Sequence, residues 1–214
     1  MGLRRLTFED RESWLAGRMR GIGGSEAAAA VGMSPFSTPL ELWKLKIGAT
    51  EQKDLSGNPA VQRGVRMESA IRGFFEANHP ELAVEYHQYD VLFQEERPWL
   101  YATLDGELIR ENGERGVLEI KTASPNGKLG WAQWADGRMP QHYFLQTLHQ
   151  LLATGYEFVY LFAALYSVSG DITLREYEFL RSDAKDDMAW LLKRETEFWR
   201  MVERGEMPGV PLML

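Results

Sequence analysis

The stretch that most restricts the fold of this chain is residues 117–122 (VLEIKT), an apolar run interrupted by two charges. Successive side chains of a β-strand point to opposite faces of the sheet. Glu119 and Lys121 therefore share one face, and Leu118 and Ile120 share the other. A carboxylate and an ammonium group in a half-buried strand need polar partners, because an unpaired buried charge is costly. The sequence thus predicts a core strand that carries a polar site.

The surrounding residues predict an α/β fold. Segments 84–93 and 99–109 alternate apolar and polar residues as strands do, and a turn-forming stretch at 111–114 precedes residues 117–122. Further strands are expected at 157–167 and 173–179, and helices at 7–20, 26–31, 38–48, 60–78, 139–154 and 182–204. We expect a mixed central β-sheet flanked by helices, in one domain that spans residues 1–214.

Composition removes several kinds of chemistry. The chain has no cysteine, which excludes disulfides, thiolate zinc sites, cysteine nucleophiles and iron–sulfur clusters. A metal ion must therefore be held by oxygen or by histidine. The four histidines, His79, His87, His142 and His149, show no paired metal-ligand spacing, and we expect them on the surface or in the core. Nucleotide-binding glycine motifs and the G-x-S-x-G hydrolase motif are also absent from the sequence.

The net charge bears on the partners of the protein. The balance of 24 basic and 31 acidic residues gives −7, which argues against a protein that simply coats DNA. This net charge does not exclude a nucleic-acid enzyme, because carboxylates that hold divalent cations count as negative in the formal charge until the cation binds. No apolar run reaches the ~18 residues of a membrane helix. Acidic residues follow the N-terminus where an export signal would be apolar, so we expect no membrane association and a cytoplasmic location.

One constellation of charged residues suggests catalysis. Asp105, in Leu104-Asp105-Gly106, ends one predicted strand, and the hairpin at 111–114 can bring it beside Glu119 and Lys121. A hard cation such as Mg²⁺ prefers such an oxygen cluster, and a nearby lysine can act on an attacking water. A Glu/Lys pair also commonly lies on the solvated face of an edge strand, and Asp-Gly is a common turn. From these residues alone, both interpretations stay open.

Two further motifs lie in the first third of the chain. On the predicted helix 60–78, three- and four-residue spacings place Glu68 on the apolar stripe, where it needs a partner. The glycine-rich turn at 21–26 places Ser25 as the cap of an alanine-rich helix. Such a turn beside a helix N-terminus can bind an anion, although a plain capping loop is the commoner interpretation.

Taken in order, these motifs resemble a known family. They are Trp14-x3-Arg18, the turn at 21–26, Gly64-x3-Glu68, Asp105-Gly106, residues 118–121 (LEIK) and Tyr143-x2-Gln146. Together they resemble the YqaJ-type viral recombinase family, which includes the phage lambda exonuclease and belongs to the PD-(D/E)XK nucleases. The resemblance covers about residues 10–165 and implies a restriction-endonuclease-like core.

The resemblance assigns a metal site. It implies that Asp105, Glu119 and Glu68 bind Mg²⁺, as two ions, with Mn²⁺ as an acceptable substitute. It further implies that Lys121 acts on the nucleophilic water and that Gln146 orients water or phosphate.

The resemblance also assigns DNA contacts. Arg18 and Ser25 match residues that grip the 5′-phosphate of a DNA end, and Thr103 matches a position where a serine assists. Tyr143 matches a residue that lines the site, and Val61 matches an apolar residue that splays the end of the duplex. A guanidinium group and a helix N-terminus are physically suited to phosphate.

Two positions depart from the family pattern. Leu104 replaces the proline of the PD-(D/E)XK name, a substitution that leaves the metal ligands intact. Some members carry an arginine shortly after the catalytic lysine, and this chain has Lys128 as the nearest basic residue. Lys128 either replaces that arginine or the contact is lost.

The function implied by the resemblance is a Mg²⁺-dependent 5′-to-3′ exonuclease that acts on linear double-stranded DNA and leaves 3′ single-stranded tails for phage-type recombination. A homotrimeric ring, a phage-type single-strand annealing protein as partner, and a bacterial or phage-infected cell are implied with it. The alternatives are a metal-dependent endonuclease or repair nuclease of the same fold, and a non-catalytic DNA-end-binding recombination scaffold.

Overall fold

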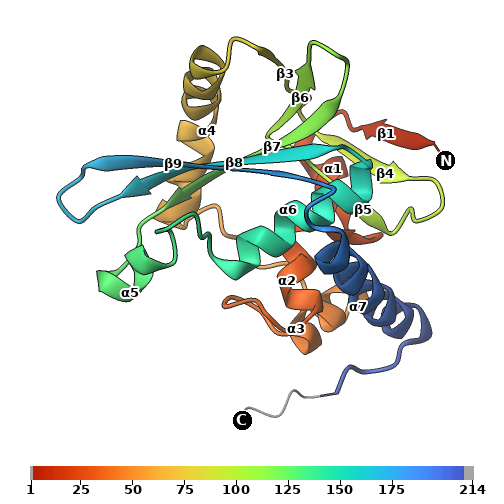
Figure 1. The fold of residues 1–214 in the computed structure, drawn as a ribbon. Coiled ribbons are helices and arrows are strands. Elements are labelled where there is room, and N and C mark those ends of the chain that lie inside the picture. The colour runs from red at the N-terminus through yellow and green to blue at the C-terminus, as the bar shows by residue number, and fades with distance from the viewer. Residues whose placement is uncertain (1, 210–214) are drawn as a thin grey trace.

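A computed structural model describes residues 2–209 and shows two β-sheets with helices packed around them (Figure 1). The strands are β1 (Leu3–Thr7), β2 (Ile22–Gly23), β3 (Leu82–Glu85), β4 (Asp90–Gln94), β5 (Leu100–Ala102), β6 (Gly106–Arg110), β7 (Arg115–Ala123), β8 (Phe158–Tyr166) and β9 (Ile172–Leu180). The helices are α1 (Arg11–Arg18), η1 (Gly24–Glu26), α2 (Ala27–Ala30), α3 (Pro39–Lys46), α4 (Pro59–Asn78), α5 (Gly127–Ala132), α6 (Gln141–Thr154) and α7 (Lys185–Arg204).

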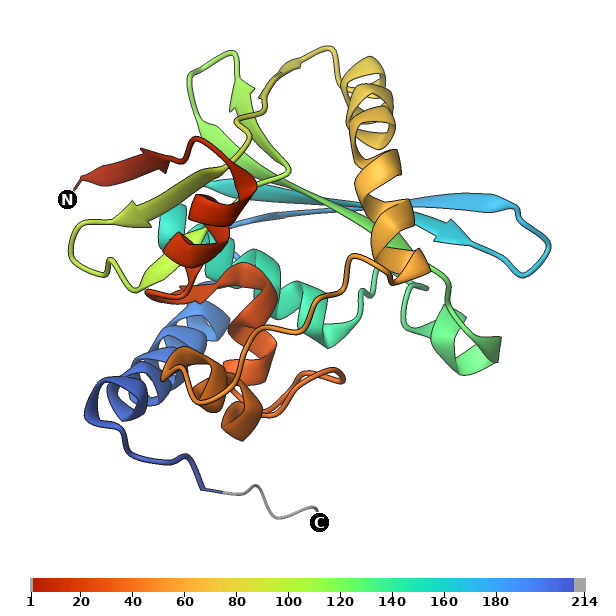
Figure 2. The same ribbon diagram turned by 180° about the vertical axis from the view of Figure 1, so that it is seen from behind.

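The larger sheet confirms the expected mixed α/β architecture. Its strand order is β3-β6-β7-β8-β9, and only β7 and β8 run parallel within it. α4 packs on the face that carries Leu118 and Ile120, while α6 packs on the opposite face beside Val117. The two helices lie on opposite sides of the sheet in Figures 1 and 2. Strand β7 is therefore covered on both faces, as its apolar sequence predicts.

A second sheet was not predicted. It has four strands in the order β1-β4-β5-β2. The expected strand 84–93 divides into β3 and β4, which belong to different sheets, and the expected strand 99–109 divides into β5 and β6. Tyr89 marks the first division with a left-handed φ of 62°. In 84–93 the apolar positions change phase between Tyr86 and Tyr89, a break that the sequence analysis did not use.

The N-terminal segment also differs from its prediction. Residues 3–7 form β1, which pairs antiparallel with β4, and the helix begins only at Arg11. Asp10 fixes that start, because its carboxylate accepts a hydrogen bond of 2.8 Å from the Ser13 amide. Ser25 is not a helix cap as predicted. It lies inside η1, whose N-cap is Gly23, and the Gly23 amide donates to the Glu26 carboxylate at 2.9 Å.

An ionic cluster around the buried Glu107 joins the two sheets. Glu107 of β6, only 3% exposed, forms ion pairs with Arg5 of β1 and with Arg115 of β7, the latter at 3.0 Å. Arg5 also pairs with Asp90 of β4 at 2.6 Å, and the Tyr156 hydroxyl donates to Glu107. The two carboxylates are buried and the two arginine side chains are partly exposed, so the cluster links the two sheets through Glu107 and Asp90.

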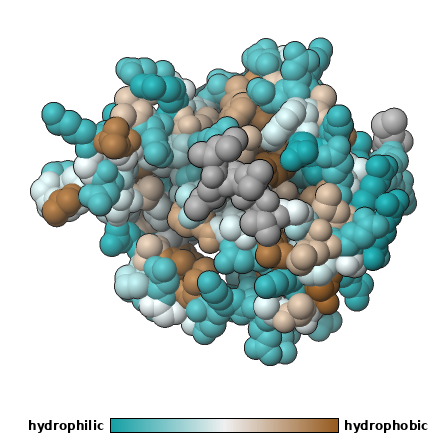
Figure 3. Space-filling view, turned by 90° about the horizontal axis from the view of Figure 1, so that it is seen from below, coloured by the Kyte–Doolittle hydropathy of each residue, from teal (hydrophilic) through white to brown (hydrophobic). Residues whose placement is uncertain are grey.

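Within residues 2–209, the helices are too short or too polar to cross a lipid bilayer. On the face shown in Figure 3, hydrophobic side chains form small patches that hydrophilic side chains separate.

His149 and Glu195 link α6 to α7 in the core. Both side chains are fully buried, and Nδ1 of His149 lies 2.7 Å from a Glu195 carboxylate oxygen. Nε2 faces the Tyr101 carbonyl oxygen at 2.9 Å. Because both ring nitrogens face acceptors, the geometry favours the doubly protonated imidazolium ion. Burial opposes this charge, but the two acceptors outweigh it and raise the pKa of His149.

We therefore expect part of the stability to be lost at higher pH. A raised pKa in the folded state stabilises the fold below the unfolded value of ~6.5, and this contribution disappears as the pH rises through the folded-state pKa. Urea unfolding across this pH range measures the effect. In Glu195→Gln, which keeps an acceptor for His149, the free energy of unfolding should fall less with rising pH. An identical pH dependence in the two proteins would contradict the role of this pair.

Candidate active site

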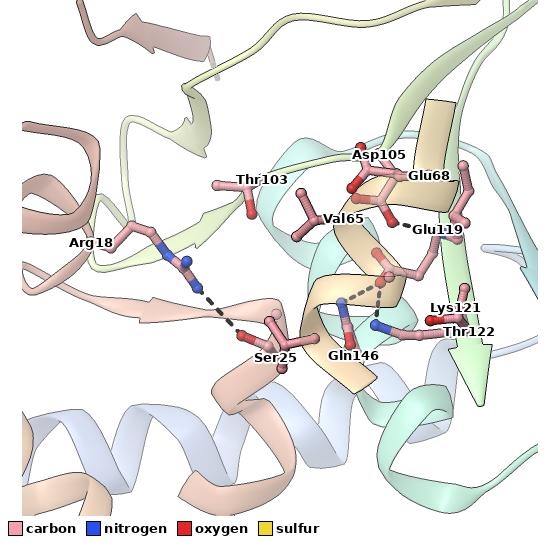
Figure 4. A pocket seen from close by; sticks show the side chains of 14 residues that line it. Arg18, Ser25, Val65, Glu68, Thr103, Asp105, Glu119, Lys121, Thr122 and Gln146 are labelled. Carbon is pink, nitrogen blue, oxygen red and sulfur yellow. Dashed lines mark hydrogen bonds and ion pairs between the residues drawn. The ribbon is translucent and has the colours of Figure 1, made fainter. Parts of the chain in front are cut away.

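A cavity of about 300 Å³ lies between α4, the end of β7 and the η1 turn. Nine of the ten site residues predicted from the sequence line it: Arg18, Ser25, Val61, Glu68, Thr103, Asp105, Glu119, Lys121 and Gln146. Figure 4 shows Arg18 and Ser25 on one side of this cavity and the three carboxylates on the other. The cavity therefore has a cationic end and an acidic end.

Strand pairing places the first carboxylate. Asp105 immediately precedes β6, and Gly106 pairs with Leu118 of β7. One oxygen of Asp105 accepts a hydrogen bond of 2.8 Å from the Ile120 amide, which holds the side chain against β7. Burial, followed by the charges of Glu119 and Glu68, raises the pKa of Asp105 well above its ordinary value. Like charges at this short range favour a cation between them.

Three neighbouring side chains hold the Glu119 carboxylate in place. Its side chain is 3% exposed, and one oxygen lies 2.6 Å from Nε2 of Gln146 and 2.5 Å from Nζ of Lys121. The other oxygen accepts a hydrogen bond of 2.5 Å from Gln150. Gln150 was not predicted as a site residue. Its spacing of four from Gln146 on the same helix could have revealed it, because such residues share a face.

Glu68 approaches from α4 with its own partner. Arg72, one turn further along, donates to Glu68 at 2.7 Å and to the Asp105 carbonyl at 2.6 Å. Burial raises the pKa of Glu68, and the positive charge of Arg72 opposes this shift. Arg72 also stacks on Tyr86, with its guanidinium carbon 3.7 Å from the ring centroid. Arg72 therefore orients the Glu68 carboxylate and ties α4 to the backbone at Asp105, a role that the sequence analysis missed.

The chemistry of these donors suits a divalent cation, although the side chains do not yet form a coordination shell. Mg²⁺ prefers carboxylate oxygens and retains several waters. Across residues 2–209, no three Asp, Glu or His side chains converge on a common point in the manner of metal ligands. The reason lies at Glu119, whose oxygens already accept from Lys121 and two glutamines. To bind a metal ion, Glu119 must therefore exchange some of these hydrogen bonds for metal coordination.

Lys121 lies at the acidic end of the cavity. Burial lowers the pKa of this ammonium group, but Glu119 and Asp105 outweigh it, and the net pKa is raised. Lys121 is therefore charged and acts as a hydrogen-bond donor. Tyr143 does not line the cavity as predicted. Its ring lies behind Lys121, 5.0 Å from Nζ, and packs near Trp134.

Arg18 and Ser25 form the cationic end, with 3.4 Å between the guanidinium group and the serine hydroxyl. A buried lysine holds this end together. Nζ of Lys46, on α3, donates to the Arg18 carbonyl at 3.1 Å and pairs with Glu26 at 2.8 Å. No sequence pattern connected Lys46 with this turn. Lys128 is exposed on α5 and does not line the cavity, so it does not supply a second cation there.

Comparison with known proteins identifies the family of this chain. The family model of the YqaJ-like viral recombinase domain matches residues 13–157, which is well over half of the chain. The chain belongs to this family. The uncharacterized protein YqaJ of Bacillus subtilis (strain 168) is 29% identical over 201 residues, which are 94% of this chain and 59% of that protein. The chain thus spans about 59% of the length of this relative.

Solved structures confirm the fold. The alkaline exonuclease LHK-Exo of Laribacter hongkongensis superposes with a TM-score of 0.69 at 20% identity, covering 92% of this chain and 94% of the enzyme. The same enzyme in complex with dAMP gives the same values. The fold of this family member is therefore that of the alkaline exonuclease, with the predicted residues gathered in one cavity.

The crowding of carboxylates generates a prediction about metal binding. We expect Asp105→Asn to stabilise the metal-free protein by on the order of 1 kcal/mol, because it removes a repelling charge and keeps an acceptor for Ile120. Mg²⁺ at ~100 times its Kd should stabilise the unmodified protein by ~2.7 kcal/mol and the variant far less. Thermal unfolding with and without Mg²⁺ measures both effects.

Glu96→Gln, which changes an exposed carboxylate outside the cavity, is the matched control. It should respond to Mg²⁺ as the unmodified protein does. Equal Mg²⁺ stabilisation of Asp105→Asn would show that the ion binds elsewhere.

Proposed function

We propose that this protein is a metal-dependent exonuclease that degrades one strand of linear double-stranded DNA from its 5′ end. The observation that carries the proposal is the division of one cavity into an Arg18–Ser25 end and an acidic end with Lys121. A cationic end suits a terminal phosphate, and an acidic end suits a metal ion that acts on the next phosphodiester. The family and the fold support a nuclease.

The chemistry at the acidic end follows from its residues. Asp105, Glu119 and Glu68 would hold Mg²⁺, or Mn²⁺ in its place, which supplies positive charge for the developing oxyanion and lowers the pKa of water. Lys121, already charged, donates a hydrogen bond to the attacking water or to a phosphoryl oxygen. Gln146 holds Glu119 in position. Metal binding would release Lys121 from Glu119 and so free its ammonium group to donate to water or phosphate.

The other end of the cavity supplies the preference for DNA ends. Arg18 donates in a planar fork that matches a phosphate, and Ser25 and Thr103 add hydroxyl groups. A terminal phosphate carries more negative charge than an internal phosphodiester, so binding it at Arg18 would favour an exonuclease over an endonuclease. Val61, exposed on α4 and lining the cavity, would separate the two strands.

The biological setting is part of the same proposal. The 3′ single-stranded tails would be substrates for a phage-type single-strand annealing protein, in the cytoplasm of a bacterial or phage-infected cell. A homotrimeric ring would let a protein of net charge −7 gather its basic residues on an inner surface around DNA. Such a ring would also let the enzyme slide without dissociating.

Linear duplex DNA labelled separately at its 5′ and 3′ ends tests polarity and metal dependence together. We expect early release of the 5′ label with Mg²⁺, no release with EDTA, and no release by Asp105→Asn. Covalently closed circular DNA should stay intact. Cleavage of the circle would favour an endonuclease, and binding without cleavage would favour a recombination scaffold.

The binding of the 5′-phosphate by Arg18 can be tested separately. Arg18→Gln should reduce the preference for 5′-phosphorylated over 5′-hydroxyl ends by ~10-fold or more, because a charge-assisted bond to phosphate is worth ~1.5–3 kcal/mol. Initial cleavage rates on the two duplexes measure this preference. Arg20→Gln, an exposed position outside the cavity, should leave it unchanged. Equal rates on both ends in the unmodified protein would remove the assignment of Arg18.

A further inference from the structure

A second cavity lies beside the candidate active site, on the far side of the contact between α4 and β7. It has a volume of about 560 Å³, and its lining includes Arg63, Ser124, Asn126 and Tyr166. These residues come from the first turns of α4, from the segment after β7, and from the end of β8. Figure 2 shows these three segments next to one another, near the β8–β9 hairpin.

The two cavities are neighbours across one tight contact. Gly64 and Thr122 line the first cavity, and a Cβ added at Gly64 would lie 3.2 Å from the Thr122 hydroxyl. Arg63 adjoins Gly64 on α4, and Ser124 lies two residues after Thr122. Helix α4 and the segment at the end of β7 thus contribute residues to both cavities.

The chemistry of the second cavity differs from that of the first. No carboxylate side chain appears among its described lining residues, although the protein as a whole carries −7. The Arg63 guanidinium group donates to the Ser124 hydroxyl at 3.2 Å and lies over the Tyr166 ring, 4.9 Å from its centroid. The Tyr166 hydroxyl is buried and has no hydrogen-bond partner. A cation, hydroxyl groups and an aromatic face are the groups that bind single-stranded nucleic acid.

We propose that this second cavity binds the DNA strand on the side of the cleavage position away from Arg18, with a backbone phosphate on Arg63 and Ser124 and a base or sugar against Tyr166. The inference rests on the proposed function and extends it to a second substrate subsite. In this subsite Arg63, and not Lys128, is the basic residue that contacts DNA beyond strand β7. Arg63 is exposed, so its charge is available to a ligand.

Arg63→Gln tests this subsite, and the same helix offers a matched control. Arg66 is also exposed on α4, but it lines neither cavity, and its Nε donates to the Gln62 carbonyl at 3.2 Å. Affinity is measured by fluorescence anisotropy in EDTA, on a 5′-phosphorylated single strand of ~12 nucleotides. Arg63→Gln should raise Kd by ~10-fold and reduce the salt slope by about one, whereas Arg66→Gln should change Kd less than ~2-fold.

A shorter ligand separates a subsite from a general effect. A 5′-phosphorylated dinucleotide reaches the first cavity only, so both variants should bind it as the unmodified protein does. Equal effects of the two substitutions on the longer strand, or an effect of Arg63→Gln on the dinucleotide, would overturn the subsite. If the unmodified protein neither binds nor cleaves DNA, the proposed function itself fails. Binding and cleavage that are insensitive to Arg63 would remove the subsite alone.

Discussion

The pairing of β6 with β7 is the constraint on which the candidate site depends. Because Gly106 lies opposite Leu118, Asp105 reaches the Ile120 amide, and Glu119 and Lys121 fall on the face that α6 covers. A slip of one residue in this register would turn every side chain of β7 to the opposite face. The apolar contacts of Leu118 and Ile120 with α4 make that slip costly. The same hydrophobic packing that forms the core therefore fixes the position of the acidic groups.

Crowded carboxylates come at a cost in stability, and neighbouring residues reduce it. Arg72 neutralises Glu68 from the helix side, and Lys121 lies against Glu119 from the strand side. Neither contact compensates Asp105, whose pKa is raised by burial and then by the charges of Glu119 and Glu68. A divalent cation would remove that repulsion, because each carboxylate would then face a positive charge. The site thus gives up some stability in the metal-free protein and gains a strong preference for a cation.

The sequence predicts those parts of the molecule that depend on local patterns. The spacing on helix 60–78 and the alternation at 117–122 singled out Glu68 and Glu119, and both residues line the same cavity. Arg72 was not predicted as a site residue, because the Asp105 carbonyl to which it donates is distant in the chain. Its spacing of four residues from Glu68 could have indicated the other contact. Lys46 carried no such signal, since its role arises only when α3 packs behind the turn. The division of 84–93 between two sheets was also missed, although the apolar positions change phase between Tyr86 and Tyr89.

The two ends of the cavity are stabilised by different parts of the fold, and this separation has a consequence. The acidic end belongs to β6, β7 and α4, whereas the Arg18 end is anchored through Lys46 of α3. Their relative position therefore depends on how the two sheets are held together, which is the role of the buried Glu107 cluster. Since the proposed reaction needs a terminal phosphate and a phosphodiester to be held at once, small changes in that spacing should affect catalysis more than binding. The ionic cluster around Glu107, two residues after Asp105 in the chain, is in this way part of the geometry on which the proposed reaction depends.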